Sequence, residues 1–225
     1  MAGAPRADKR LTQEEAYAWQ AVLRNMCAER DRIAEAMLFA ISKHESAQEI
    51  VGMLAHSIIT EEASASSKLG RLLVTSDILC NAGTSARKAR AYNVLLQGHM
   101  PQIMASLNNS LLRCEGRITM ESFRRRIMAV LSVWSDRMIF NEEFLVGIEV
   151  TFLRGAHPAL GTHLSAEATT RLRQELGTRS DHQLAMQCKH NGLDSRGSRQ
   201  RLIARILLHE DRKVERQLPT ALSQE

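Results

Sequence analysis

The chain has 225 residues, of which 44% are hydrophobic, and it carries a formal net charge of +5. This hydrophobic content argues against an intrinsically disordered chain and is sufficient for one or two folded domains. The four cysteines form no CxxC pair, which argues against a zinc ribbon or a disulfide scaffold.

The N-terminal stretch MAGAPRADKR is short and polar, and it lacks the apolar core of a signal peptide. No run of 18 apolar residues occurs, so we expect no transmembrane helix. We therefore expect an intracellular protein, in the cytosol or the nucleus. Most of the basic excess lies near the C-terminus, where residues 163–217 hold 11 Lys and Arg against 7 Asp and Glu.

Apolar residues recur at helical spacing through most of the chain. Thr12 followed by Glu15 is a capping-box pattern at the start of the first predicted helix. We expect helices over 11–26, 29–41, 45–59, 67–81, 86–112, 119–138 and 141–153. The fifth is expected to break near Gly98–Pro101. Because no alternating strand pattern separates them, the sequence predicts an all-α superhelix or bundle of about eight helices.

The stretch GAHPALGT, rich in small residues and containing a proline, is the best candidate for a linker. We therefore expect a first domain over 11–153, a linker over 154–163 and a separate helical segment over 164–212. The two ends, 1–10 and 218–225, are expected to be disordered.

Asp77 stands inside the apolar helical run LLVTSDILCNAG (72–83). Aspartate is a poor helix former, and a carboxylate buried without a partner is costly, so Asp77 needs a hydrogen-bond donor. That donor is either an arginine within the fold or a group from an external ligand. Asn81 follows one helical turn later, on the same face.

Three segments together resemble the CID, the domain that interacts with the C-terminal tail of RNA polymerase II. They are RIAEAMLFAISKHESAQEIVGML (32–54), RLLVTSDILCNAG (71–83) and FRRRIMAVLSVWSDRMIF (123–140). In that family the fourth helix carries a D-x-x-x-N core, matched here by Asp77 and Asn81, and a later helix carries a tryptophan, matched by Trp134. The resemblance implies a right-handed superhelix similar to VHS and ENTH domains, without a cofactor.

The resemblance also implies a groove that binds the heptad repeat Tyr-Ser-Pro-Thr-Ser-Pro-Ser. Asp77 would accept hydrogen bonds from the tyrosine hydroxyl or a backbone N–H, with Asn81 near the peptide backbone. Family members that read phosphoserine use an arginine just before the tryptophan, but in this chain Ala129 stands at that place.

Other basic residues are therefore the candidates for a phosphate contact, because a guanidinium binds phosphate through two parallel hydrogen bonds. Three consecutive arginines on a helix, 124–126, point in three directions, so at most two of them face the groove. The candidates are Arg125 and Arg126, followed by Arg71 and Lys88. The alternative is a solvated basic face.

The segment HQLAMQCKHNGLDSRGSRQRLIARILLHE (182–210) resembles a SAP motif, in which two helices are joined by a Gly-Leu turn. Its apolar residues are expected to face one another across the two helices, namely Leu184, Cys188, Leu193, Leu202, Ile203 and Ile206. The resemblance implies phosphate contacts to nucleic acid through Lys189, Arg196, Arg199, Arg201 and Arg205. The alternative is a helical brace whose arginines are solvated.

The stretch CKHNGL (188–193) is similar to one that follows the CID in the SURP-motif-containing, snRNP-associated subfamily of splicing factors. It contains Cys188 and His190, but these lack further ligands for zinc, and His44-Glu45 lacks a second histidine at metalloprotease spacing. No phosphate-binding loop and no G-x-S-x-G elbow occurs. We therefore predict no metal site and no enzyme.

The sequence as a whole predicts a nuclear binding module. It would dock the phosphorylated tail of RNA polymerase II, associate with splicing and snRNP proteins, and couple pre-mRNA splicing or 3′-end processing to transcription. One alternative is a structural scaffold that has lost tail binding, which Ala129 would explain. Another is a membrane adaptor of the VHS or ENTH kind, which is disfavoured because the basic excess is not on an amphipathic N-terminal helix.

Overall fold

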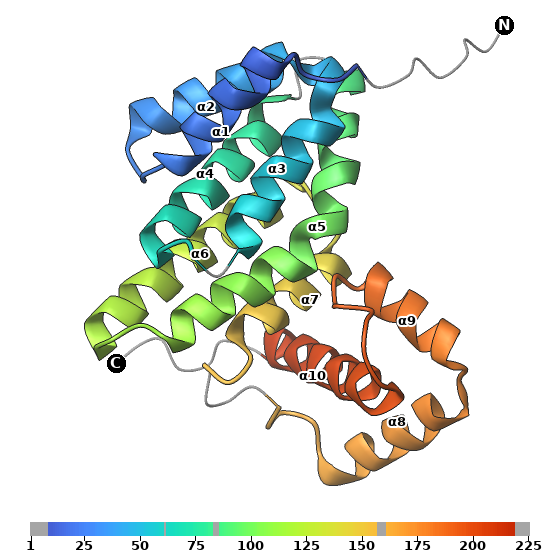
Figure 1. Ribbon diagram of the computed structural model, residues 1–225. Helices are drawn as coiled ribbons and strands as arrows, with labels where there is room; N and C mark the ends of the chain where they lie inside the picture. The colour runs from blue at the N-terminus through green and yellow to red at the C-terminus, as the bar shows by residue number, and fades with distance from the viewer. Residues whose placement is uncertain (1–8, 61, 83–85, 157–160, 219–225) are drawn as a thin grey trace, which may run out of the picture. The chain divides into compact units, whose positions relative to one another are not determined.

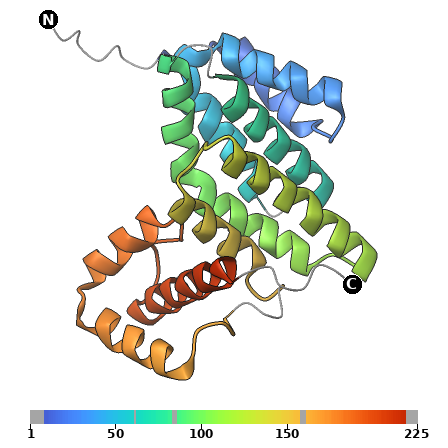
Figure 2. The same ribbon diagram turned by 180° about the vertical axis from the view of Figure 1, so that it is seen from behind.

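The computed structural model describes residues 9–60, 62–82, 86–156 and 161–218. All regular structure in this part of the chain is helical, which confirms the all-α prediction (Figures 1 and 2). None of the helices has an apolar stretch long enough to cross a bilayer. The contacts divide the chain into two compact units, Met1–Ile139 and Phe140–Glu225.

Six α-helices and a short 3₁₀ helix build the described part of the first unit. They are α1 (Gln13–Arg24), α2 (Arg30–Ser42), η1 (His44–Ser46), α3 (Ala47–Ile59), α4 (Ala65–Asn81), α5 (Ala86–Leu112) and α6 (Arg117–Asp136). The capping box at the start of α1 is confirmed: the Thr12 hydroxyl accepts from the N–H of Glu15, and the Glu15 carboxylate accepts from the N–H of Thr12.

The helix α5 is one continuous element of 27 residues, so the break expected near Gly98–Pro101 was wrong. Proline removes one intrahelical hydrogen bond and crowds the preceding turn, which bends a helix but does not always end it. Figure 1 shows α5 changing direction along its length. Leu96, Met100 and Ile103 around this position are fully buried, and α3 packs along α5. Tertiary packing therefore keeps the helix intact through the proline.

The helix α4 lies at the centre of the first unit, in contact with α2, α3, α5 and α6. Its buried residues are mostly apolar and closely packed, and they also include Lys68, Arg71, Thr75 and Ser76. A Cβ on Gly70 would lie 2.9 Å from the carbonyl carbon of Cys27. On the side toward α6, the indole N–H of the buried Trp134 donates to the Ser76 hydroxyl at 3.1 Å. This hydrogen bond fixes the position of α6 beside α4.

The second unit contains α7 (Glu142–Leu153), α8 (Ala166–Thr178), α9 (Asp181–His190) and α10 (Arg199–Gln217). Its core joins residues of all four helices and of the turn between α9 and α10. The packing expected from the SAP-like pattern is confirmed, because Leu184, Cys188, Leu193, Leu202 and Ile206 belong to one buried cluster, with Ile203 against it. Val146 and Val150 of α7 belong to the same cluster.

A close backbone approach in the second unit lies between α7 and the turn after α9. A Cβ on Gly147 would lie 1.6 Å from the carbonyl oxygen of Asn191. Gly192 has a φ of +66°, and a Cβ there would lie 2.5 Å from the carbonyl oxygen of Phe144. Glycine is therefore required on both sides of this contact. Gly147 is required because a side chain would not fit, and Gly192 is required for that reason and because its φ is positive.

A buried carboxylate holds the start of the C-terminal segment. Asp211 on α10 accepts hydrogen bonds from the N–H groups of Gly161, His163 and Leu164 at 2.7 to 2.8 Å. Burial raises the pKa of the Asp211 carboxyl, but these donors outweigh it, so the pKa is lowered overall. The charged form of Asp211 therefore stabilises the folded unit.

The predicted domain limits stay predictions. The helix α7 was expected to end the first domain, and its contacts group it with the second unit. Residues 1–8 and 219–225, which include most of the expected disorder, lie outside the described part, as do residues 157–160 of the expected linker.

Replacing Gly147 by alanine should destabilise the second unit by at least about 3 kcal/mol, because the new methyl group would overlap the Asn191 carbonyl. The matched control is Gly177→Ala in α8, where a Cβ meets nothing within 4 Å and should add up to about 1 kcal/mol of helix stability. Urea denaturation of the whole chain, with hydrogen exchange read over 142–153 and 188–193, measures both. Equal stability of the two variants would contradict the close approach.

Candidate functional site

A groove of about 440 Å³ lies between α4 and α6. The two helices lie side by side and run in the same general direction (Figures 1 and 2). The lining from α4 shares one helix face, as does the lining from α6, because both sets recur at three- and four-residue steps. The lining residues of α4 are Leu73, Ser76, Asp77, Cys80 and Asn81. Those of α6 are Arg126, Ala129, Val130 and Val133, joined by its C-cap residue Arg137.

Asp77 is the half-buried carboxylate in this groove. Among the described residues, no group donates a hydrogen bond to its side chain and no ion pair within 4 Å reaches it. Burial raises the pKa of the Asp77 carboxyl above its usual range, while the positive charges of Arg137 and Arg30 act in the opposite direction. One alternative from the sequence was that an arginine within the fold pairs with Asp77. The structure has arginines that attract the Asp77 carboxylate from a longer range, but none of the described ones forms an ion pair with it.

Asn81 lies one turn beyond Asp77 on the exposed edge of the groove. Its side-chain amide donates to the backbone carbonyl of Asp77 at 2.9 Å. This hydrogen bond fixes the side chain against the last turn of α4 and leaves the amide oxygen as an acceptor. The structure thus brings Asp77 and Asn81 to one wall of the groove.

The three consecutive arginines of α6 have three different environments. Arg126 lines the groove. Arg124 forms a two-pronged ion pair with Glu121, with Nε to Oε2 at 2.9 Å and the second pair of atoms at 2.7 Å. Arg125 is exposed and does not line the groove. Only Arg126 of this run is therefore placed to meet a ligand in the groove.

Arg137 is a lining residue that sequence reasoning missed. It is the C-cap of α6, where the N–H of Met138 bonds to Ser135 and the N–H of Ile139 bonds to Trp134, with Met138 at a φ of +51°. Its side chain is exposed, and no hydrogen bond or ion pair engages it among the described residues. The sequence contained a pattern that could have identified Arg137. It shares one helix face with Arg126, Val130 and Val133.

Arg71, which was a candidate for peptide contact, lies inside the first unit and not in the groove. Its Nε donates to the carbonyl of Leu23 at 2.9 Å, and its guanidinium also donates to the carbonyl of Ser57. Its side chain therefore joins α4 to the ends of α1 and α3. The side chain of Lys88, another candidate, lies outside the described part of the chain.

The basic residues of the SAP-like segment divide into internal and exposed sets. Arg205 donates to the carbonyls of Asp194 and Arg196, each at 2.6 Å. Arg199 donates to Asp181 and to the carbonyls of Gly177 and Arg179, and Arg196 pairs with Asp194. Lys189 and Arg201 are exposed, with no ion pair within the described residues. Arg199 and Arg205 thus act as braces of the second unit.

One group of side chains in the described part of the second unit has atoms close enough to hold a metal ion, namely Glu143, His209 and Glu210. The buried His209 already contacts the Glu143 carbonyl at 2.9 Å and the Glu210 carboxylate at 3.2 Å. Lys213 lies 2.8 Å from Glu143 and 3.4 Å from Glu210. Its ammonium group balances the two carboxylates, so we interpret the group as an ion-pair network.

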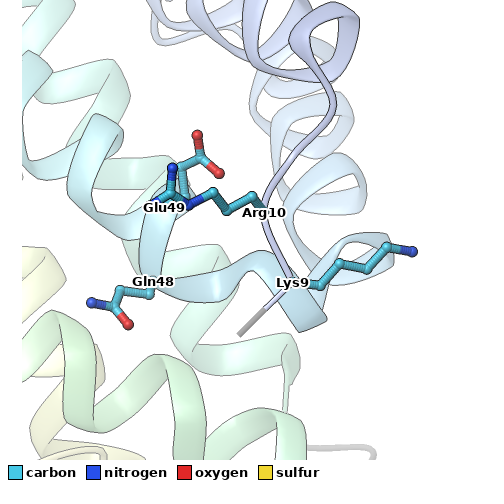
Figure 3. A pocket seen from close by; sticks show the side chains of 4 residues that line it. All are labelled: Lys9, Arg10, Gln48 and Glu49. Atoms are coloured by element: carbon cyan, nitrogen blue, oxygen red, sulfur yellow. The ribbon is translucent and has the colours of Figure 1, made fainter. Parts of the chain in front are cut away.

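A second hollow, of about 450 Å³, lies where the N-terminal stretch crosses the start of α3. Figure 3 shows Arg10 extending toward Glu49, whereas Lys9 points away. The Glu49 carboxylate also accepts from the N–H of Leu11 at 2.8 Å. This contact ties the N-terminal stretch to α3, and no residue predicted for function lies there.

Comparison with known proteins identifies the family. The CID domain family matches residues 18–148. Two relatives from Arabidopsis thaliana are similar to this chain. Protein RRC1-like is 31% identical and Protein RRC1 is 30% identical. Each match covers 93% of this chain and 25% of the relative. The chain thus spans about a quarter of the length of these curated relatives. Because the family match covers more than half of the chain, this protein belongs to the CID domain family.

Proposed function

We propose that this chain binds the C-terminal tail of RNA polymerase II in the groove between α4 and α6. The observation that carries the proposal is the Asp77 carboxylate, half-buried in a groove and without a hydrogen-bond donor among the described residues. A carboxylate in this state gains most from an external donor, and the tyrosine hydroxyl and backbone N–H groups of the heptad are donors. Membership of the CID family supports this ligand.

The remaining lining residues suit the other features of a heptad peptide. Leu73, Val130 and Val133 offer apolar surface for a tyrosine ring or a proline. Asn81 offers an amide oxygen to the peptide backbone, and Arg126 offers a guanidinium to a phosphoserine. Affinity should be modest, because a disordered tail must become ordered on binding.

A role in coupling splicing or 3′-end processing to transcription, in the nucleus and with splicing partners, is part of the proposal. It rests on the tail as ligand and on the likeness of CKHNGL to a stretch in snRNP-associated splicing factors. In the SAP-like segment, Lys189 and Arg201 are the side chains best placed for nucleic-acid phosphates, because Arg196, Arg199 and Arg205 are engaged within the unit.

A structural scaffold is the second candidate, and one observation favours it. Ala129 lies in the groove at the place where the phosphate-reading arginine of the family would stand. A scaffold would show no saturable binding to any heptad peptide, phosphorylated or not. Titration of a labelled peptide panel followed by fluorescence anisotropy separates the two candidates.

Asp77→Asn should weaken peptide binding by about tenfold or more, because a hydrogen bond to a charged group contributes about 1.5–3 kcal/mol. The melting temperature should stay the same or rise slightly, since the substitution removes a partly buried charge that the fold does not pair. Asp136→Asn, at an exposed carboxylate outside the groove, is the matched control. Unchanged affinity in Asp77→Asn would remove Asp77 from the site.

Binding of the unphosphorylated peptide should weaken on acidification at a higher pH than for an ordinary aspartate. The pKa of Asp77 is raised, so the carboxylate takes up its proton earlier as the pH falls and then ceases to be a charged acceptor. The stability effect has the opposite sign, because a raised folded-state pKa favours folding as the pH falls through it. Anisotropy titrations between pH 4 and 7 measure this, and Asp77→Asn should show a flatter profile.

A further inference from the structure

Met138 departs from two ordinary preferences of a folded chain. Its φ is +51°, and every other residue with a positive φ in the described part of the chain is a glycine. Its side chain is large and apolar, and it is 86% exposed. The left-handed conformation crowds the Cβ of an L-residue and costs free energy, and so exposed a side chain gains little packing that would offset this cost. The fold alone would therefore favour glycine at position 138.

The backbone around Met138 is fixed by hydrogen bonds within the first unit. The end of α6 is a Schellman motif, in which the N–H of Met138 donates to the carbonyl of Ser135 and the N–H of Ile139 donates to the carbonyl of Trp134. The side-chain amide of Asn93 on α5 donates to the carbonyl of Ile139 at 2.8 Å. A strained conformation persists only where its surroundings determine it, and such residues cluster at ligand-binding sites. The turn thus holds Met138 at one place on the surface.

This place is one end of the groove between α4 and α6. Arg137, the residue before Met138, lines the groove, as does Val133 one turn earlier on α6. The side chain of Val133 is itself 39% exposed, so this end of the groove offers apolar surface that is open to solvent. Apolar surface contributes free energy to binding when a ligand covers it.

We propose that Met138 is a specificity-determining residue of the groove and that its side chain packs on a proline ring of the bound tail. This inference rests on the proposed function and names the part of the tail that this end of the groove selects. The large apolar side chains of the heptad are its tyrosine and its two prolines. The tyrosine hydroxyl is the proposed donor to Asp77, so a proline remains for the apolar end.

The chemistry of the two side chains suits this contact. Methionine is unbranched and has a polarisable thioether, so it adapts its shape to an irregular apolar surface. A proline ring loses almost no side-chain freedom when it becomes buried. Stability and binding therefore place opposite demands on position 138, since glycine would suit the turn and methionine suits the peptide.

The test uses the full chain and a fluorescein-labelled, unphosphorylated heptad peptide of two repeats. The variants are Met138→Gly, Met138→Gln, Met138→Leu and, as a matched control, Ile118→Gln. Ile118 is 87% exposed in the first turn of α6 and does not line the groove. Melting curves measure stability, and fluorescence anisotropy measures affinity at low and at high salt.

Met138→Gly should raise the melting temperature by about 2–4 °C, because glycine adopts a positive φ without strain. It should also weaken peptide binding by about threefold to tenfold, because part of a methionine side chain is no longer buried. Met138→Gln should weaken binding by the same factor without raising the melting temperature. Met138→Leu should bind within about twofold of the wild-type chain. Ile118→Gln should bind as the wild-type chain does.

Two further measurements identify the contact as apolar and assign it to proline. The loss of affinity in Met138→Gln should be the same at low and at high salt, because salt screens charges and not apolar contacts. Replacing the proline at one heptad position by alanine in both repeats should weaken binding to the wild-type chain. The same replacement should change little in Met138→Gln, because the two changes remove one shared contact.

The inference is overturned if Met138→Gln binds the peptide as tightly as the wild-type chain, or if Ile118→Gln loses as much affinity. It is also overturned if Met138→Gly lowers the melting temperature, because Met138 would then serve the fold, or if neither proline replacement is coupled to Met138→Gln. Loss of affinity in Asp77→Asn but not in Met138→Gln would leave the proposed function standing without this inference. If the wild-type chain binds no peptide at all, both fail together.

Discussion

The hydrogen bond from the Trp134 indole to the Ser76 hydroxyl is the interaction on which the candidate site depends. It is buried, and it joins the two helices that supply every lining residue of the groove. A large ring on α6 fills the space against α4, while its single donor fixes the register of the two helices. With that register set, Asp77 and the α6 arginines come to the same groove. The tryptophan of the family pattern therefore acts by positioning the site.

The distribution of arginine partners distinguishes side chains that build the fold from those available to a ligand. Arg71, Arg199 and Arg205 donate to backbone carbonyls, because a guanidinium that is taken out of water must satisfy its donors within the protein. Arg126 and Arg137 are exposed along the groove, where solvent is able to satisfy their donors. All five residues are arginines with the same charge. Whether one of them stabilises the fold or stays accessible depends on how deeply it is buried and on which acceptor lies nearest.

The second unit shows the physical basis of the short stretch CKHNGL. Gly192 allows the chain to turn with a positive φ, Leu193 fills the core beneath the turn, and Asn191 contacts α7 at the position of Gly147. A glycine on each element allows the two backbones to approach more closely than side chains would permit. The stretch thus packs closely against α7 through backbone as well as side chains.

Much of this protein was determined by its sequence alone. Helical periodicity, the Thr12–Glu15 capping box and the apolar faces of the two SAP-like helices depend on neighbours within a few turns, and the structure has them as expected. That Asp77 and Asn81 share one helix face could be predicted for the same reason, while their role in binding stays a prediction. Tertiary structure decided the rest. Pro101 stayed inside α5 because packing outweighed the lost hydrogen bond, Arg71 turned inward to carbonyls of α1 and α3, and only Arg126 of its run met the groove. Arg137 became part of the site only when α6 was placed beside α4. An arginine becomes buried when it meets acceptors that are distant in the sequence. Helical spacing describes only near neighbours, so it does not predict which arginine this will be.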